Sequence, residues 1–270
     1  MRLPILILLL SCWLSAAWAA PRAELWQRWT AHDPASTIAV DHGAWERFLE
    51  RHLVVREEVN LLDYAGVDPA GYRNLTGYLG YLAGVPVSHL SRDRQLAYWI
   101  NLYNALTVKV VLDHYPVESI RDIDISPGLF SDGPWGKKLI RVEGQSLSLD
   151  DIEHRILRPI WQDPRIHYAV NCASIGCPSL APEPFTATNA ATLLDRKARR
   201  YINDPRGVAF KGGELVVSSL YHWFEEDFGG SEAGVLDHLR RYASGPLRAR
   251  LEDMAGYHRH RYDWSLNDMP

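Results

Sequence analysis

The stretch DRQLAYWINLYNALTVKVVLDH, residues Asp93–His114, decides the fold. Its apolar side chains recur at intervals of three and four residues, which is the repeat of an α-helix; they are Leu96, Trp99, Ile100, Tyr103, Leu106, Val110 and Val111. Pro116 follows and ends the pattern. Because apolar residues occupy most faces of this helix, we expect it to be buried.

On the C-terminal side of this helix, short strands and short helices are expected. Ser148 stands at a predicted helix N-cap, with Asp150 and Asp151 in the first turn. The apolar run 166–170 is typical of a short buried strand. The other expected elements are a loop over 117–136, a hairpin of 138–142 with 145–147, a helix over 152–157 that ends before Pro159, a loop over 171–184, a helix over 190–202, a hairpin of 208–210 with 215–217, helices over 219–227 and 232–243, and a strand over 258–264.

On the N-terminal side, two aromatic pairs are each spaced by three residues: Trp26 with Trp29, and Trp45 with Phe48. This spacing predicts helices that pack on a core. We therefore expect residues 20–89 to form a helical region packed on a domain of residues 90–270. The chain has no internal repeat and no linker-like tract, so the sequence predicts a single α+β domain with a small, mainly antiparallel sheet packed by helices.

The composition and the N-terminus bear on partners and location. With 47% hydrophobic and 23% charged residues among 270, the chain is typical of a globular protein, and its net charge of −4 gives no reason to expect a nucleic-acid partner. Arg2, the apolar run 5–10 and Ala17-Trp18-Ala19 predict a signal peptide over 1–19 and a periplasmic or secreted protein. A lipidated Cys12 is the alternative. No later segment approaches about 20 uninterrupted apolar residues, so no membrane span is predicted.

Reactive side chains are densest between residues 153 and 177, where Glu153, His154, His167, Cys172 and Cys177 occur. A cysteine is an effective nucleophile where a neighbouring imidazole favours the thiolate and a carboxylate fixes the imidazole tautomer. We predict Cys177 as the nucleophile, His167 as the general base and Glu153 as the group that orients it.

Several alternatives remain open at this point. Cys172 competes as nucleophile, because Pro178 has no N–H to offer an oxyanion formed at Cys177. In an oxidising compartment Cys172 and Cys177 can also form a disulfide. The spacing of the histidines and cysteines matches no common zinc pattern, so no metal is predicted. A phosphate-binding glycine loop is absent from the sequence, and no cofactor is predicted.

Four further residues are candidates for binding substrate: Asn101, Asn104, Trp135 and Cys172. The two asparagines are polar side chains within an apolar helix, where a buried amide needs partners, so we expect them to line the site or to hold a loop.

Two more side-chain groups are expected to be structural. Glu153 and His154 are neighbours that a regular helix cannot turn the same way, so we expect at least one of them to be structural. The acidic run Glu225-Glu226-Asp227 is expected to be a solvated face.

Four ordered segments resemble the DUF547 family, and together they span roughly residues 90–267. They are YWINLYNAL (98–106), LDDIEH (149–154), IHYAVNCASIGCP (166–178) and YDWSLN (262–267). The family is named for its lack of an assigned activity, and its pattern includes the positions of Glu153, His167 and Cys177. The resemblance implies an exported bacterial member and a relation to papain- or transglutaminase-like thiol enzymes. Here, however, His167 precedes Cys177, which is the reverse of the usual order in those enzymes.

These observations predict an exported thiol-dependent hydrolase or acyltransferase that acts on an amide or thioester bond of a small molecule or peptide through Cys177, His167 and Glu153. The alternative is a non-catalytic periplasmic binding module in which a Cys172–Cys177 disulfide fixes the loop over 171–184. The sequence does not indicate the oligomeric state.

Overall fold

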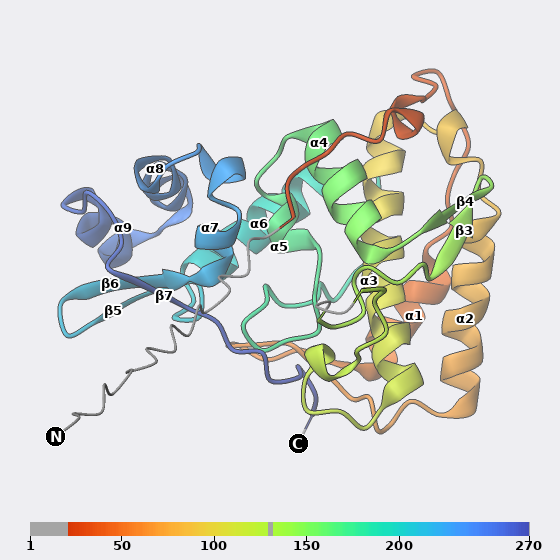
Figure 1. The fold of residues 1–270 in the computed structure, drawn as a ribbon, viewed down its shortest axis with the longest axis horizontal. Coiled ribbons are helices and arrows are strands. Elements are labelled where there is room, and N and C mark those ends of the chain that lie inside the picture. Colours follow the sequence, from red (N-terminus) through yellow and green to blue (C-terminus); the bar gives the residue numbers. More distant parts are fainter. Residues whose placement is uncertain (1–20, 129–131, 270) are drawn as a thin grey trace, which may run out of the picture.

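Helix α3 (Arg92–His114) lies at the centre of the larger of two hydrophobic cores in the computed structural model, which describes residues 21–128 and 132–269. Helices α1 (Gly43–His52) and α2 (Pro69–Ala83) contribute Trp45 and Leu75 to the same core. Figure 1 shows α2 running alongside α3. The prediction of a buried central helix is therefore confirmed, and the N-terminal helices share its core.

The remaining elements are mostly short, and the longest of them are α6 and α8. In chain order they are η1 (Gln27–Thr30), β1 (Leu53–Val54), β2 (Leu61–Leu62), η2 (Val87–His89), η3 (Ile120–Asp122), β3 (Ile140–Val142), β4 (Gln145–Leu147), η4 (Asp151–Leu157), α4 (Arg158–Trp161), α5 (Ile166–Ala169), α6 (Ala190–Ile202), β5 (Val208–Lys211), β6 (Glu214–Ser218), α7 (Ser219–Trp223), η5 (Glu225–Phe228), α8 (Glu232–Tyr242), α9 (Gly245–Glu252) and β7 (Arg259–Arg261). Strands β1–β2, β3–β4 and β5–β6 pair antiparallel, and β7 joins β6 in parallel. The predicted α+β class with small, mainly antiparallel sheets is confirmed.

A second hydrophobic core fills the C-terminal part, between the β5–β6–β7 sheet and helices α8 and α9 (Figure 1). Helix α6 connects the two cores, because Leu193 packs in the first and Tyr201 in the second. Helix α5 does the same through Ala169 and Tyr168. Side chains from both parts can therefore meet where α5 lies.

Both predicted hairpins are present, and their turns explain why the sequence identified them. Glu143 and Gly144 have φ of 43° and 80°, and Gly212 and Gly213 have 59° and 89°. Tight two-residue turns between strands favour such left-handed conformations, which glycine adopts without steric cost. Helix α6 also occupies the predicted range.

Two predictions near the centre of the chain are wrong. Residues 166–169 form helix α5 instead of a strand, because Asp163 starts a helical turn by accepting hydrogen bonds from Arg165 and Ile166. A short apolar run that is buried on all sides carries no period that separates strand from helix. The helix expected to end before Pro159 continues to Trp161, since this proline occupies the first turn of α4, where a missing N–H is tolerated.

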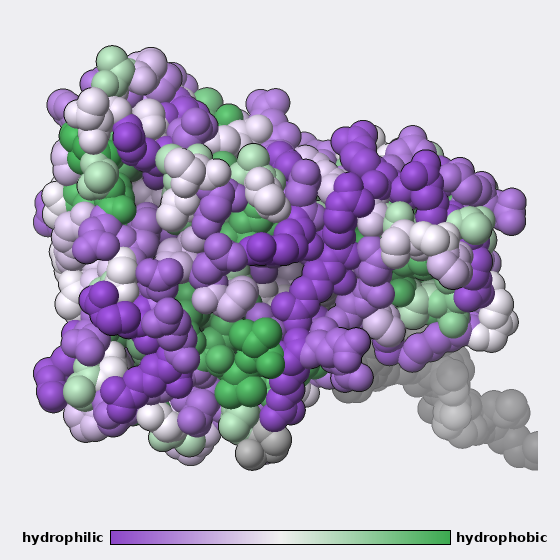
Figure 2. Space-filling view, turned by 180° about the vertical axis from the view of Figure 1, so that it is seen from behind, coloured by the Kyte–Doolittle hydropathy of each residue, from purple (hydrophilic) through white to green (hydrophobic). Residues whose placement is uncertain are grey.

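Figure 2 shows that hydrophilic residues cover most of the rear face, with apolar residues in separate patches. Within the described residues, no helix has the length and apolar character needed to span a bilayer. The predicted signal peptide over 1–19 and the alternative lipidated Cys12 lie outside the described residues.

Buried His42 makes the stability of this core depend on pH. Its Nδ1 lies 2.6 Å from the Tyr78 hydroxyl, and burial lowers its pKa from 6.5 to about 4 although Asp41 opposes the shift. Between these two pH values the unfolded chain takes up a proton that the folded protein excludes, so the stability contribution is present above pH 6.5 and is lost as the pH falls toward 4. We expect His42→Asn to remove about 2 kcal/mol of the decline in unfolding free energy between pH 7 and pH 5. Urea titrations of the wild type and the variant across this range measure the unfolding free energy. The same decline with falling pH in both proteins would contradict the prediction.

Candidate active site

A pocket of about 270 Å³ opens where the two cores meet. Its lining comes from α3, η4, α5 and α7, from the loop that precedes β3 and from the loop after α5. The described residues that line it are Pro21, Tyr103, Ser126, Pro127, Asp132, Trp135, Gly136, Asp150, Glu153, His154, His167, Val170, Cys172, Cys177, Leu220, Trp223, Phe224 and Trp264.

The η4 segment is a π-helical turn. The N–H of Arg158 bonds to the carbonyl of Glu153, five residues earlier. Ser148 and Asp151 cap its start reciprocally, as the predicted N-cap requires. Glu153 and His154, neighbours on this turn, both line the pocket. The expectation that at least one of them is structural stays a prediction, and π-helical turns of this kind occur often at functional sites.

His167 stands between two carboxyl groups. Its Nε2 lies 2.6 Å from Asp227 Oδ2, and its Nδ1 faces Glu153 Oε1 at 3.7 Å. Arg158 donates to the same oxygen of Asp227 at 2.5 Å. The ring of Phe224 stacks on the imidazole with centroids 4.2 Å apart. The contact with Asp227 favours the tautomer that carries its proton on Nε2, so the Nδ1 lone pair is directed toward Glu153.

The surroundings of Glu153, His167 and Asp227 shift their pKa values in different directions. Burial raises the pKa of Glu153 to about 7, against the opposing effects of Arg158 and of a hydrogen bond with Tyr103. Burial lowers the pKa of His167, although Asp227 opposes the shift. Burial also acts to raise the pKa of Asp227, but hydrogen bonds from His167 and Arg158 outweigh it and hold this pKa well below its ordinary value. Near neutral pH, Asp227 is therefore ionised while Glu153 titrates.

The two cysteines lie on a tight loop that follows α5. The backbone N–H of Cys172 points at Cys177 Sγ, 3.1 Å away, and Ala173 between them has a φ of 55°. A positive φ at a residue other than glycine costs free energy and persists only where the surrounding structure holds it. Gly176 is required here, because a Cβ would come within 2.7 Å of the backbone of Asp263.

Both thiols are free, and they differ in their surroundings. Cys172 Sγ lies 3.0 Å from the Tyr262 hydroxyl and 3.4 Å from the Ser174 hydroxyl. Hydrogen bonds from Cys177 and from these hydroxyls lower the pKa of Cys172 to about 7 in spite of burial. Burial raises the pKa of Cys177, which is only 4% exposed. Cys172 is thus the thiol that ionises more readily.

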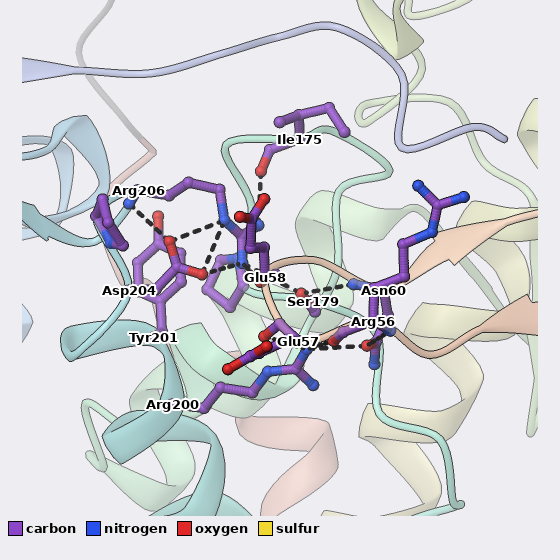
Figure 3. Close-up of polar contacts among 12 residues, drawn as sticks. Arg56, Glu57, Glu58, Asn60, Ile175, Ser179, Arg200, Tyr201, Asp204 and Arg206 are labelled. Carbon is purple, nitrogen blue, oxygen red and sulfur yellow. Dashed lines mark hydrogen bonds and ion pairs between the residues drawn. The ribbon is translucent and has the colours of Figure 1, made fainter. Parts of the chain in front are cut away.

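An arginine clasp holds this loop from outside the pocket (Figure 3). We use the term for Arg206 together with the groups that it binds. Its guanidinium donates to the carbonyls of Ile175 and Cys177 at 2.8 and 3.2 Å and to the carbonyl of Glu58 at 2.9 Å, while Asp204 neutralises its charge. The clasp joins the cysteine loop to the segment between β1 and β2.

The predicted site residues fall into two groups. Glu153, His167, Cys172, Cys177 and Trp135 all line the pocket. The amides of Asn101 and Asn104 are instead occupied by backbone groups. Asn101 bonds to the N–H and the carbonyl of Phe185, and Asn104 bonds to the carbonyl of Ala169 and the N–H of Asn171. These asparagines therefore hold loops, which is one of the two roles expected of them.

Three residues of the site escaped the sequence reasoning. Asp227 is not part of a solvated face, because its side chain is only 16% exposed and contacts His167 and Arg158. Asp227 lies 60 residues after His167, and nothing in the sequence indicates that the two side chains are in contact. Arg158 and Tyr262 were also missed, although Tyr262 begins a segment that had been recognised. Among the described residues, no group of three His, Cys, Asp or Glu side chains is arranged to hold a metal ion.

Comparison with known proteins supports part of the resemblance. Residues 87–202 match the family described as "Protein of unknown function, DUF547". This range holds α3, η4, α5, the cysteine loop and α6, and thus Glu153, His167 and both cysteines. No curated protein and no solved structure matches the chain. The relation to papain- or transglutaminase-like enzymes stays a prediction.

The arginine clasp predicts a link between stability and thiol protection. Replacing Arg206 with Ala leaves the Ile175 and Cys177 carbonyls and Asp204 without this partner, so we expect the unfolding free energy to fall by about 3 kcal/mol. We also expect Cys177 to alkylate faster in the native state. Arg196→Ala is the control, since Arg196 forms an exposed ion pair with Glu183 and its loss costs about 0.5 kcal/mol. Equal effects of the two variants in denaturant titration and iodoacetamide labelling would show that the clasp does not hold the loop.

Proposed function

We propose that the protein is a thiol-dependent hydrolase or acyltransferase that cleaves an amide or thioester bond through a covalent intermediate on Cys172. The observation that carries the proposal is the position of the Cys172 thiol, whose sulfur lies 3.0 Å from the Tyr262 hydroxyl and 3.4 Å from the Ser174 hydroxyl in a pocket that also holds the buried Glu153 carboxyl. These contacts lower the pKa of Cys172, and burial raises the pKa of Glu153 to about 7. A thiolate beside a carboxyl that titrates near neutral pH supplies a nucleophile and an acid–base group together.

This assignment changes the roles inferred from sequence while keeping the same residues. Cys172 replaces Cys177 as nucleophile, because it is more exposed and its sulfur contacts the Tyr262 hydroxyl. Cys177 supports it by a thiol hydrogen bond. Glu153 becomes the acid–base group, and His167 holds it in place, since the imidazole nitrogens face Glu153 and Asp227.

The reaction proceeds in two steps. The Cys172 thiolate attacks the substrate carbonyl carbon, a new S–C bond forms, and the C–N or C–S bond breaks as protonated Glu153 delivers a proton to the leaving group. The Glu153 carboxylate then accepts a proton from water or an amine, which attacks the thioester and releases the acyl group and the Cys172 thiolate. Each step uses the protonation state that the preceding step leaves on Glu153.

A binding module with a Cys172–Cys177 disulfide is the second candidate. It is favoured by the closeness of the two residues, since the backbone nitrogen of Cys172 lies 3.1 Å from Cys177 Sγ and the two thiols share a hydrogen bond. In either case we place the protein in the periplasm or outside the cell, on the basis of the leader-like residues 1–19.

The proposal predicts which thiol reacts. In protein purified without reductant, we expect iodoacetamide to label Cys172 first, with an apparent pKa near 7 rather than the ordinary value of about 8.5. We expect p-nitrophenyl acetate to leave an acetyl group on Cys172. We expect Glu153→Gln to slow the hydrolysis of this acetyl-thioester by about 10²-fold or more. Mass spectrometry of the wild type, Cys172→Ala and Cys177→Ala measures each step.

Two results would overturn this assignment. Preferential acetylation of Cys177 would restore the order of roles predicted from sequence. A native mass about two units below that of the reduced protein, with neither thiol reactive, would identify the disulfide module.

A further inference from the structure

We propose that the pocket selects substrates that carry a positively charged ammonium group close to the bond that is cleaved. This inference rests on the proposed function for the identity of the reacting bond, but its evidence is the charge and the aromatic surface of the pocket.

The charged side chains around the pocket are acidic. Asp132, Asp150 and Glu153 line it, and no lysine or arginine is among its described lining residues. Asp132 already forms an ion pair with Arg121, and Glu153 faces His167. Of the three carboxyl groups, Asp150 is therefore the one that a ligand cation can pair with.

Asp150 lacks a cationic partner in the described part of the chain. Its side chain is 38% exposed, and its ion-pair contact is His154 Nε2 at 3.7 Å. Burial and the positive charge of Arg158 lower the pKa of His154 well below its ordinary value, so this imidazole is neutral at pH 7. Lys138, whose positive charge acts on Asp150, forms its ion pair with Asp151. A ligand cation would supply the missing countercharge.

An aromatic wall lines the same pocket as this carboxyl. We define it as Trp135, Trp223 and Trp264, which all line the pocket. Trp264 packs against Trp135 and Trp223 with centroids 5.7 and 5.6 Å apart, and the Trp135 carbonyl accepts the backbone N–H of Asp150 at 3.0 Å. Indole faces attract cations, and Arg121 already places its guanidinium 5.4 Å from the Trp264 ring centroid.

Asp150 and the aromatic wall both favour a bound cation. An ammonium ion between Asp150 and the aromatic wall gains ionic and cation–π attraction, whereas a neutral group of the same shape gains neither. An anionic group would be repelled by Asp150. Because Cys172 and Glu153 line the same cavity of about 270 Å³, an ammonium group bound there lies within a few bonds of the reacting carbonyl.

The test compares two isosteric probes, choline and neutral 3,3-dimethylbutan-1-ol, by isothermal titration calorimetry at low salt. We expect choline to bind with a Kd in the millimolar range and the neutral alcohol to bind at least tenfold more weakly. Asp150→Asn should weaken choline binding about tenfold, and Asp150→Glu should restore much of it. Asp237→Asn is the matched control, because Asp237 is 75% exposed and lies on α8, outside the pocket lining. Thermal melting confirms that each variant is folded.

Equal binding of both probes, or unchanged choline binding in folded Asp150→Asn, would overturn the proposal. Acetylation of the thiols is measured separately on the same proteins. Cation selectivity without a reactive Cys172 would reject the proposed function and retain the charged pocket, and a reactive Cys172 without cation selectivity would do the reverse.

Discussion

The hydrogen bonds of Asn104, in the middle of α3, are the constraint on which the pocket depends. This fully enclosed amide donates to the Ala169 carbonyl at 3.0 Å and accepts the Asn171 N–H at 2.8 Å. An unpaired buried amide is costly, so the end of α5 and the start of the cysteine loop are fixed relative to α3. Asn171 extends the constraint, because its own amide bonds to the Ala173 N–H and the Pro178 carbonyl at the two ends of the loop.

The cysteine loop is thus held from three directions. Asn104 and Asn171 fix it from the first core, Arg206 binds its outer carbonyls, and the C-terminal segment pairs with its backbone through Gly176. Such support is needed because the positive φ at Ala173 and the close approach at Gly176 both oppose this conformation. The loop keeps Cys172 at the pocket surface while Cys177 stays beneath it.

The sequence was sufficient for features that depend on local periodicity and turn chemistry. The repeat in α3, the Glu143-Gly144 turn and the N-cap at Ser148 each depend on residues a few positions apart. Helix α5 was predicted as a strand, because a short run that is buried on all sides has no polar face and therefore no hydrophobic period that distinguishes a helix from a strand. The π-helical turn that carries Glu153 and His154 also left no pattern in the sequence.

The candidate site was predictable only to the extent that its residues are close in sequence. Glu153, His167 and the two cysteines fall within 25 positions, and residue chemistry alone placed them together. Asp227 and Tyr262 come from elements that pack with the second core, so only the tertiary structure brings them to His167 and Cys172. The relative acidity of the two thiols was equally hidden, since it follows from burial and from hydroxyl contacts.

The division of roles between the two carboxyl groups beside His167 follows from the positions of charge and solvent. Asp227 accepts hydrogen bonds from Arg158 and His167 on the same oxygen, so its charge is stabilised and it stays an anion. Glu153 is more deeply buried and lacks a direct ion pair with Arg158, so its charged form is costly and its proton is retained up to about pH 7. The two carboxyl groups on either side of the imidazole therefore have different roles. Asp227 fixes the ring, and Glu153 can exchange a proton with a molecule bound in the pocket.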